Sequence, residues 1–295
     1  MLTAMPTPLI TATELNQLLS QGTHDVVLFD CSFDLADPAA GREAYHQGHL
    51  PGAYYLHLDN ELSGPKTGFN GRHPLPDAEL FAARLRALGV NDGSLVVAYD
   101  AQGGMFAARL WWLMRWIGHG AVTVLDGGKN AWVAAGLPLE RGATPEPDTD
   151  SENGTGGDLS RKASLVPTID AEALLANLAS PARLVVDARA ADRFRGENET
   201  LDPVGGHIPG AVNRFFKDNL AADGHFKPAE TLRAEFGQVF AGKAPADTVM
   251  QCGSGVTACH NLLAMEVAGL TGAALYPGSW SEWCADPKRP VATGA

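Results

Sequence analysis

Apolar residues alternate along this chain between short continuous runs and longer segments with an apolar residue at every third or fourth position. The short runs are rich in Val and Leu, and they comprise Val26–Asp30, Leu95–Tyr99, Leu184–Asp187 and Thr248–Gln251. Such runs are typical of strands buried on both faces of a sheet. The periodic segments predict helices at 169–179, 231–240 and 256–268, with Thr168 as the N-cap of the first and Gly269 ending the last. Alternating strands and helices predict an α/β fold with mainly parallel sheets that carry helices on both faces.

The pattern occurs twice along the sequence as an internal repeat, which indicates two similar copies of one domain. Residues 48–53 read Gly-His-Leu-Pro-Gly-Ala, and residues 206–211 read Gly-His-Ile-Pro-Gly-Ala. Residues 126–132 match 277–283 in the same way, and the strand runs pair in the same order. The acids and histidines that recur in both copies favour structural roles; they are Asp30, Asp187, His49 and His207.

The segment between the copies is acidic and rich in Pro and Gly, so it predicts a solvated linker. We therefore expect a first domain at 1–140, a linker at 141–165 and a second domain at 166–295.

Charge and composition exclude several classes of partner. The 295 residues carry a net charge of −12, which argues against nucleic acid and anionic membranes as partners. Neither a secretory signal nor a membrane-spanning run is evident. The four cysteines are irregularly spaced, which favours reduced thiols in the cytoplasm, and no sequence motif predicts a metal site. A fused repeat is compatible with a monomer.

The strongest chemical signal is Cys252, which directly follows a strand run and precedes Gly253, Ser254 and Gly255. Glycines let successive backbone N–H groups point inward, and the following helix contributes its own unpaired N–H groups. Such a loop stabilises a thiolate and any anion formed on the sulfur. The alternative is that Cys252 is a small buried apolar residue. The first copy has Asp100 in the equivalent position, so only the second copy retains a nucleophile.

These motifs give the whole chain a resemblance to the tandem-domain rhodanese-type sulfurtransferases. The resemblance implies two rhodanese-like domains, of which only the second is catalytic. Residues 252–258 read Cys-Gly-Ser-Gly-Val-Thr-Ala, which looks like the active loop of the 3-mercaptopyruvate branch. The resemblance implies that Cys252 is the nucleophile and that the following loop residues bind substrate; these are Gly253, Gly255, Val256 and Thr257.

The same resemblance assigns roles outside the loop. Arg193, in an Arg-Phe-Arg-Gly segment, matches an arginine that binds the donor. Asp59, His73 and Ser254 match the family's proposed proton relay. The branch usually carries a second substrate arginine in the stretch that corresponds to 197–205, and this chain has none there. Arg195 and Arg214 are the candidates to replace it.

The implied activity is transfer of sulfur from 3-mercaptopyruvate, through a Cys252 persulfide, to a thiol or cyanide, with release of pyruvate. The expected partners are a small anionic sulfur donor and an acceptor such as thioredoxin, a small thiol or cyanide, without a cofactor or metal. The alternative within the family is a thiosulfate:cyanide sulfurtransferase. A phosphatase-like enzyme on this scaffold would need an arginine in the loop, which is absent after Cys252. A non-catalytic module would have lost the second cysteine as well.

Overall fold

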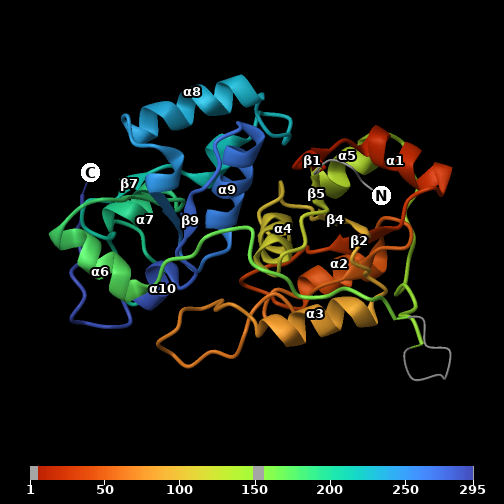
Figure 1. Ribbon diagram of the computed structural model, residues 1–295, viewed down its shortest axis with the longest axis horizontal. Coiled ribbons are helices and arrows are strands. Elements are labelled where there is room, and N and C mark those ends of the chain that lie inside the picture. The colour runs from red at the N-terminus through yellow and green to blue at the C-terminus, as the bar shows by residue number, and fades with distance from the viewer. Residues whose placement is uncertain (1–5, 149–155, 295) are drawn as a thin grey trace. The chain divides into compact units, whose positions relative to one another are not determined.

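The protein is described by a computed structural model of residues 6–148 and 156–294, which form two compact units (Figure 1). Of the described residues, the first unit comprises 6–63, 76–148, 156–165 and 223–225. The second comprises Gly64–Leu75, Val166–Ala222 and 226–294. The segment Gly64–Leu75 therefore belongs to the second unit, although it lies within the first copy of the sequence repeat.

The first unit contains a five-stranded sheet in the order β1-β5-β4-β2-β3, with every pairing parallel. Its strands are β1 (Leu9–Ile10), β2 (Val26–Asp30), β3 (Tyr54–Tyr55), β4 (Leu95–Tyr99) and β5 (Val122–Leu125). Its helices are α1 (Ala12–Gln21), α2 (Ala40–Gln47), α3 (Ala78–Ala87), α4 (Ala107–Trp116) and α5 (Gly128–Ala134).

The second unit contains a four-stranded parallel sheet in the order β7-β6-β8-β9. Its strands are β6 (Leu184–Asp187), β7 (Val212–Asn213), β8 (Thr248–Gln251) and β9 (Ala274–Leu275). Its helices are α6 (Ala171–Ala179), α7 (Ala191–Arg195), α8 (Ala229–Phe240), α9 (Thr257–Val267) and α10 (Ser279–Trp283), with 3₁₀ turns η1 (Phe216–Asn219) and η2 (Pro245–Asp247).

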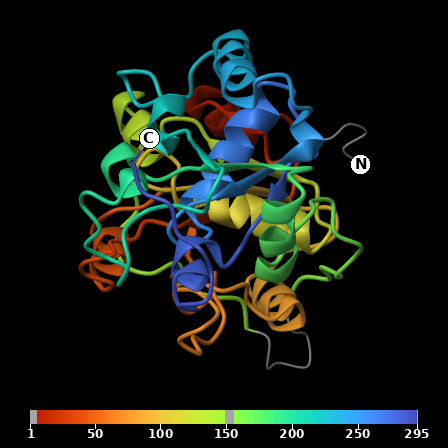
Figure 2. The same ribbon diagram turned by 90° about the vertical axis from the view of Figure 1, so that its left-hand side faces the viewer.

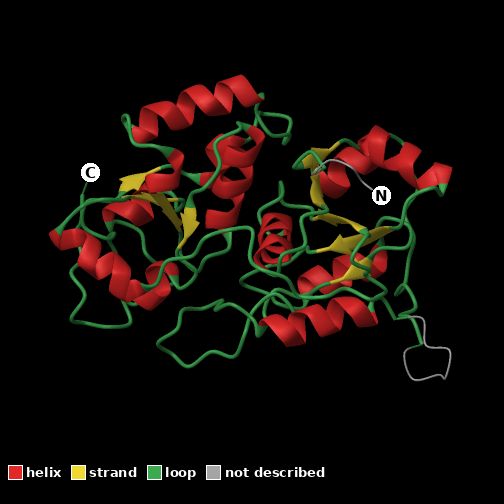
Figure 3. Ribbon diagram, viewed as in Figure 1, coloured by secondary structure: helices red, strands yellow, loops and turns green. Residues whose placement is uncertain are grey.

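Each sheet lies between helices, which confirms the predicted fold class (Figures 2 and 3). In the first unit, Leu95 and Val97 of β4 pack with Leu15 of α1 and Trp132 of α5. In the second unit, Val249 of β8 packs in the same way with side chains of α6 and α10. The helix that follows the central strand, α4 or α9, packs against that strand and its neighbour. The two sheets share one topology, so β4 and β8 are equivalent central strands.

The predicted strands are found at the predicted residues, whereas the start of α6 differs. Asp170, not Thr168, caps this helix, because its carboxylate accepts a hydrogen bond from the N–H of Ala173 at 2.8 Å. Thr168 instead forms a parallel bridge to Leu275. In the first unit β1 pairs with β5 at the same place. Thr168 is therefore extended because it continues the edge of the sheet.

The predicted linker, 141–165, follows the first unit along much of its described length. The N–H of Gly157 donates to the carbonyl of Arg86 at 2.7 Å, and that of Lys162 donates to Ile117 at 2.8 Å. Leu159 is buried, with 1 % of its surface exposed. The acidic composition concealed these anchors, because hydrogen bonds, an ion pair and one buried apolar residue hold the segment. Residues 149–155 lie outside the described part.

Candidate active site

Cys252 lies at the carboxyl end of the central strand β8 and in front of α9. Ligands on open parallel sheets bind at this edge. Its N–H donates to Ser279 Oγ at 3.1 Å, and its carbonyl accepts from the N–H of Trp280 at 2.9 Å. The side chain is buried, with 1 % exposed. The loop residues predicted to bind substrate follow it in the chain: Gly253, Gly255 and Val256 are buried and Thr257 is half-buried.

Gly255 sets the curvature of the loop. Its φ of +76° is a left-handed conformation, and a Cβ at this position would lie 2.2 Å from the carbonyl oxygen of Pro277. Only glycine fits here without moving backbone. The loop is therefore fixed against the turn that precedes α10.

The equivalent loop of the first unit shows what such a backbone holds. The Asp100 carboxylate accepts hydrogen bonds of 2.8–3.0 Å from the backbone N–H groups of Gln102, Gly104, Phe106 and Ala107. The loop between β4 and α4 is thus an anion site that its own side chain fills. This arrangement supports the expected anion-stabilising role of the corresponding loop at Cys252.

His73 and Ser254, two members of the predicted relay, are in contact. His73 Nδ1 lies 2.7 Å from Ser254 Oγ, and both side chains are buried. His73 reaches this position because Gly64–Leu75 groups with the second unit, and the segment is closed by a hydrogen bond from the N–H of Gly64 to the carbonyl of Pro74 at 3.0 Å. Asp59 belongs to the first unit, where its N–H donates to His57 Nδ1 at 3.1 Å.

Arg193, the predicted donor-binding arginine, is one member of a chain of alternating charges. The chain runs in the order Asp187, Arg189, Glu199, Arg193, Asp202 and Arg72. Arg193 contacts Glu199 at 2.8 Å and Asp202 at 3.3 Å. Three guanidinium groups thus alternate with three carboxylates beside the loop.

Glu199 and Asp202, the two acids of this chain of charges that follow α7, have pKa values shifted in opposite directions. Burial alone would raise the pKa of Glu199, but hydrogen bonds from Arg193 and from the N–H groups of Leu201 and Asp202 outweigh it and lower the pKa. Burial dominates at Asp202 and raises its pKa, despite the attraction of Arg72 and Arg193. Glu199 is therefore a firmly ionised partner, whereas the ionised form of Asp202 is costly.

Neither arginine that the sequence offered as a replacement lies in this chain of charges. Arg195 pairs with Glu197 at 2.7 Å, and Arg214 pairs with Glu235 at 2.5 Å. Arg72 is the additional guanidinium. Its Nη2 lies 2.8 Å from the position that a Cβ on Gly253 would take, and Arg193 Nη2 lies 3.6 Å from the same point. Sequence reasoning missed Arg72 because no local motif marks it.

Ser279 was also missed, although the repeat contained a signal. It is fully buried and has a φ of +53°. Gly128, its counterpart in the repeat, has a φ of +56°. A serine that replaces a left-handed glycine indicates a specific need for the hydroxyl, which here binds Cys252 and the carbonyl of Tyr276 at 2.9 Å.

The other cysteines are poor nucleophiles or packed. Burial raises the pKa of Cys31 well above its ordinary value and raises that of Cys284 to about 11. Cys259 lies within α9 and is buried. Among residues 6–148 and 156–294, no group of His, Cys, Asp and Glu is arranged to hold a metal ion, and no helix is long and apolar enough to cross a membrane.

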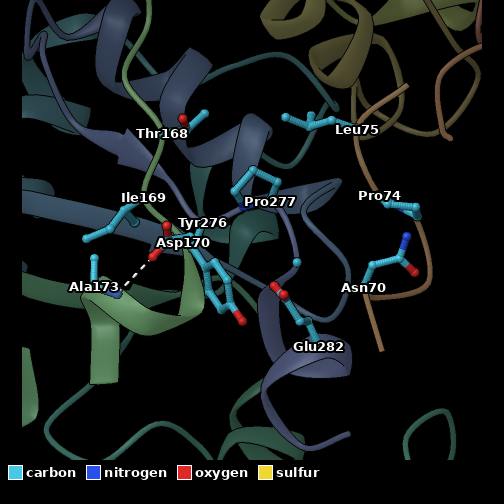
Figure 4. Close-up of a pocket in the computed structure, with 11 residues that line it drawn as sticks. Asn70, Pro74, Leu75, Thr168, Ile169, Asp170, Ala173, Tyr276, Pro277 and Glu282 are labelled. Atoms are coloured by element: carbon cyan, nitrogen blue, oxygen red, sulfur yellow. Dashed lines mark hydrogen bonds between the residues drawn. The ribbon is translucent and has the colours of Figure 1, made fainter. Parts of the chain in front are cut away.

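A separate pocket of about 400 Å³ lies beside the segment that carries Arg72 and His73 (Figure 4). Asn70, Pro74 and Leu75 line one part of it, and Tyr276 and Glu282 line another. Figure 4 shows the Asp170 carboxylate, which also lines the pocket, hydrogen-bonded to the backbone N–H of Ala173 in α6. Cys252 does not line the pocket, so the pocket does not contain the reacting sulfur.

Comparisons with known proteins agree with this geometry. The model of the rhodanese-like domain matches residues 11–135 and 170–286. A Pseudomonas aeruginosa protein named "Probable 3-mercaptopyruvate sulfurtransferase" is 47% identical over 97% of this chain and 98% of its own length. The human 3-mercaptopyruvate sulfurtransferase is 38% identical over 87% of this chain and 84% of its own.

Solved structures give the same result. The 3-mercaptopyruvate sulfurtransferase from Leishmania major superposes with a TM-score of 0.82 at 29% identity, covering 96% of this chain and 75% of that one. SseA from Escherichia coli superposes with a TM-score of 0.77 at 29% identity, covering 93% of this chain and 99% of that one. The chain therefore belongs to the family of proteins built from rhodanese-like domains, and it carries two of them.

Proposed function

We propose that this protein is a sulfurtransferase that takes sulfur from 3-mercaptopyruvate onto Cys252 and passes it to a thiol or to cyanide. The observation that carries the proposal is the place of Cys252, in a glycine-bent loop between β8 and α9 whose counterpart binds a carboxylate through backbone N–H groups. The names of the relatives support the same donor.

In the first step the Cys252 thiolate attacks the sulfur of the donor, so that an S–S bond forms and the S–C bond breaks. The electron pair of the broken bond moves to the methylene carbon and gives the enolate of pyruvate. The donor thiol loses one proton and the carbon gains one, so the step needs only a group that moves a proton. Ser254, hydrogen-bonded to His73 and two residues after Cys252, supplies such a group.

In the second step an acceptor thiolate or cyanide attacks the outer sulfur of the persulfide. The S–S bond breaks and its electron pair returns to Cys252. A thiol acceptor leaves as a persulfide and cyanide leaves as thiocyanate, so the enzyme is restored. We place this cycle in a reducing compartment such as the cytoplasm, because the four cysteines, all within the described residues, are not in disulfides.

Mass spectrometry tests the first step. After incubation with 3-mercaptopyruvate, the protein is expected to gain one sulfur atom on the peptide that contains Cys252. Cys252→Ser removes this gain, while Cys284→Ser, which changes a thiol of raised pKa, retains it. A sulfur-free protein after donor treatment contradicts the proposal.

Thiosulfate is the second candidate donor, because the guanidinium groups of Arg72 and Arg193 beside Gly253 suit an anionic donor of either kind. The ratio of kcat/KM for the two donors, measured on one preparation, decides between them. We expect the larger value for 3-mercaptopyruvate, because the loop itself carries no cationic side chain.

A further inference from the structure

Two guanidinium groups converge beside the nucleophile. The nearest atoms to a Cβ built on Gly253 are Arg72 Nη2 at 2.8 Å, Arg193 Nη2 at 3.6 Å and Arg193 Nη1 at 3.8 Å. Gly253 directly follows Cys252, so these cationic groups lie against the residue next to the nucleophile. Paired guanidinium groups bind carboxylates through charge-assisted hydrogen bonds.

The position of Arg72 is fixed by specific contacts. Its backbone N–H donates to Ser281 Oγ at 3.0 Å, and the N–H of Ser281 donates to the carbonyl of Gly253 at 2.9 Å. The preceding residue, Gly71, has a φ of +84°, and a Cβ there would lie 2.7 Å from the carbonyl oxygen of Gly278. Ser281 thus joins the backbone of Arg72 to that of the active loop.

A carboxylate already bridges the two arginines. Asp202 contacts Arg72 Nη1 through one oxygen and Arg193 Nη2 at 3.3 Å through the other. Its side chain is 3 % exposed. Arg193 has a second partner in Glu199, so it stays paired when Asp202 is displaced.

We propose that Arg72 and Arg193 together bind the carboxylate of the sulfur donor, at a site that the Asp202 carboxylate occupies in the free protein. The inference rests on the proposed function and names a residue that binds the carboxylate of the donor. The incoming carboxylate exchanges with that of Asp202, so the number of charges that face the two arginines is conserved. Arg72 is then a binding residue contributed by Gly64–Leu75, the segment that also supplies His73.

The test compares binding of pyruvate with binding of its neutral amide, measured by calorimetry, together with KM for 3-mercaptopyruvate. Arg72→Ala is expected to weaken pyruvate and raise KM about 10- to 100-fold, the loss of one charge-assisted hydrogen bond, and to leave the amide unchanged. Arg72→Lys is expected to give an intermediate loss, because it keeps the charge without the planar fork. Arg195→Ala, which removes an exposed arginine paired with Glu197, is the matched control and leaves all three values unchanged.

Asp202→Asn tests the exchange. It removes the competing charge while it preserves the shape of the side chain, so pyruvate is expected to bind several-fold more tightly. Pyruvate binding and KM that are unchanged in Arg72→Ala, or equal losses for pyruvate and its amide, would overturn the proposal, as would weaker pyruvate binding in Asp202→Asn. Failure of the proposed function has a different signature, since the wild-type protein would then form no persulfide on Cys252 whatever its affinity for pyruvate.

Discussion

Ser279→Ala is expected to loosen the active loop without touching the sulfur. The Ser279 hydroxyl accepts from the N–H of Cys252 at 3.1 Å and donates to the carbonyl of Tyr276 at 2.9 Å, and all three residues are buried. Its removal leaves a buried donor and a buried acceptor without partners. Each costs about 1–3 kcal/mol, so the variant loses about 2–6 kcal/mol from the second unit.

Ser279→Gly separates the hydroxyl from the backbone. It loses the same hydrogen bonds, but it relieves the left-handed conformation at φ +53°. We expect it to be more stable than Ser279→Ala by about 1 kcal/mol. Ser20→Ala, at an exposed position of α1, serves as the control.

Hydrogen exchange of peptides that cover β8 and the start of α9 measures the effect locally. A loss of about 2 kcal/mol raises the exchange rate by about 30-fold when opening is limited by stability. Wild-type exchange in Ser279→Ala would refute the argument that the hydroxyl holds the loop. Faster exchange in Ser279→Gly than in Ser279→Ala would refute the argument from the left-handed backbone.

Further expectations follow from the loop, the relay and an exposed acid. Gly255→Ala is expected to reduce the rate of persulfide formation by at least about tenfold, because its Cβ would clash with the backbone of Pro277; normal kinetics would show that the turn adapts. Ser254→Ala and His73→Gln are each expected to lower kcat with 3-mercaptopyruvate by about 10²–10⁴. The double variant is expected to lose no more than the worse single variant, because the two residues act as one unit, and additive losses would contradict a relay. Hydrogen bonding from the backbone N–H of Ser160, together with Lys162, lowers the pKa of Asp92 to about 2. The stabilisation that ionised Asp92 gives to the segment after residue 156 is therefore complete above the pKa of Asp92 in the unfolded chain, and it is lost as pH falls through about 2. Pepsin cleavage in that segment is therefore expected to increase over this range, and Asp92→Asn to be cleaved already at pH 4; equal cleavage of both proteins would refute the role of Asp92.

Local pattern was sufficient for the four longer strands β2, β4, β6 and β8, whereas the other strands of the two sheets were not predicted. Val26–Asp30 and Thr248–Gln251 are continuous apolar runs, and a central strand buried on both faces allows few other sequences. The start of α6 was predicted wrongly because Thr168 and Asp170 are both good caps, and only the sheet partner Leu275 decides between them. Such a decision depends on tertiary structure.

At the functional site, too, features that are contiguous in the sequence were predicted, whereas those that depend on tertiary structure were not. Cys252 was found because a nucleophile, its glycine loop and the following helix are contiguous in the sequence. Arg72 was missed because its partner Asp202 lies far along the chain and neither residue belongs to a recognisable pattern. The repeat placed Ser279 opposite Gly128, but a left-handed conformation at both positions becomes evident only from the backbone.

Four backbone N–H groups of the first loop donate to the one carboxylate of Asp100, and this has a consequence for turnover in the second unit. In the proposed cycle Cys252 alternates between thiolate and persulfide, each of which carries one negative charge. A loop whose N–H groups are arranged for a single charge therefore needs no reorganisation between the two half-reactions. The N–H groups are then oriented when the chain folds, and each sulfur transfer proceeds in a loop that already stabilises one negative charge, on the thiolate or on the persulfide.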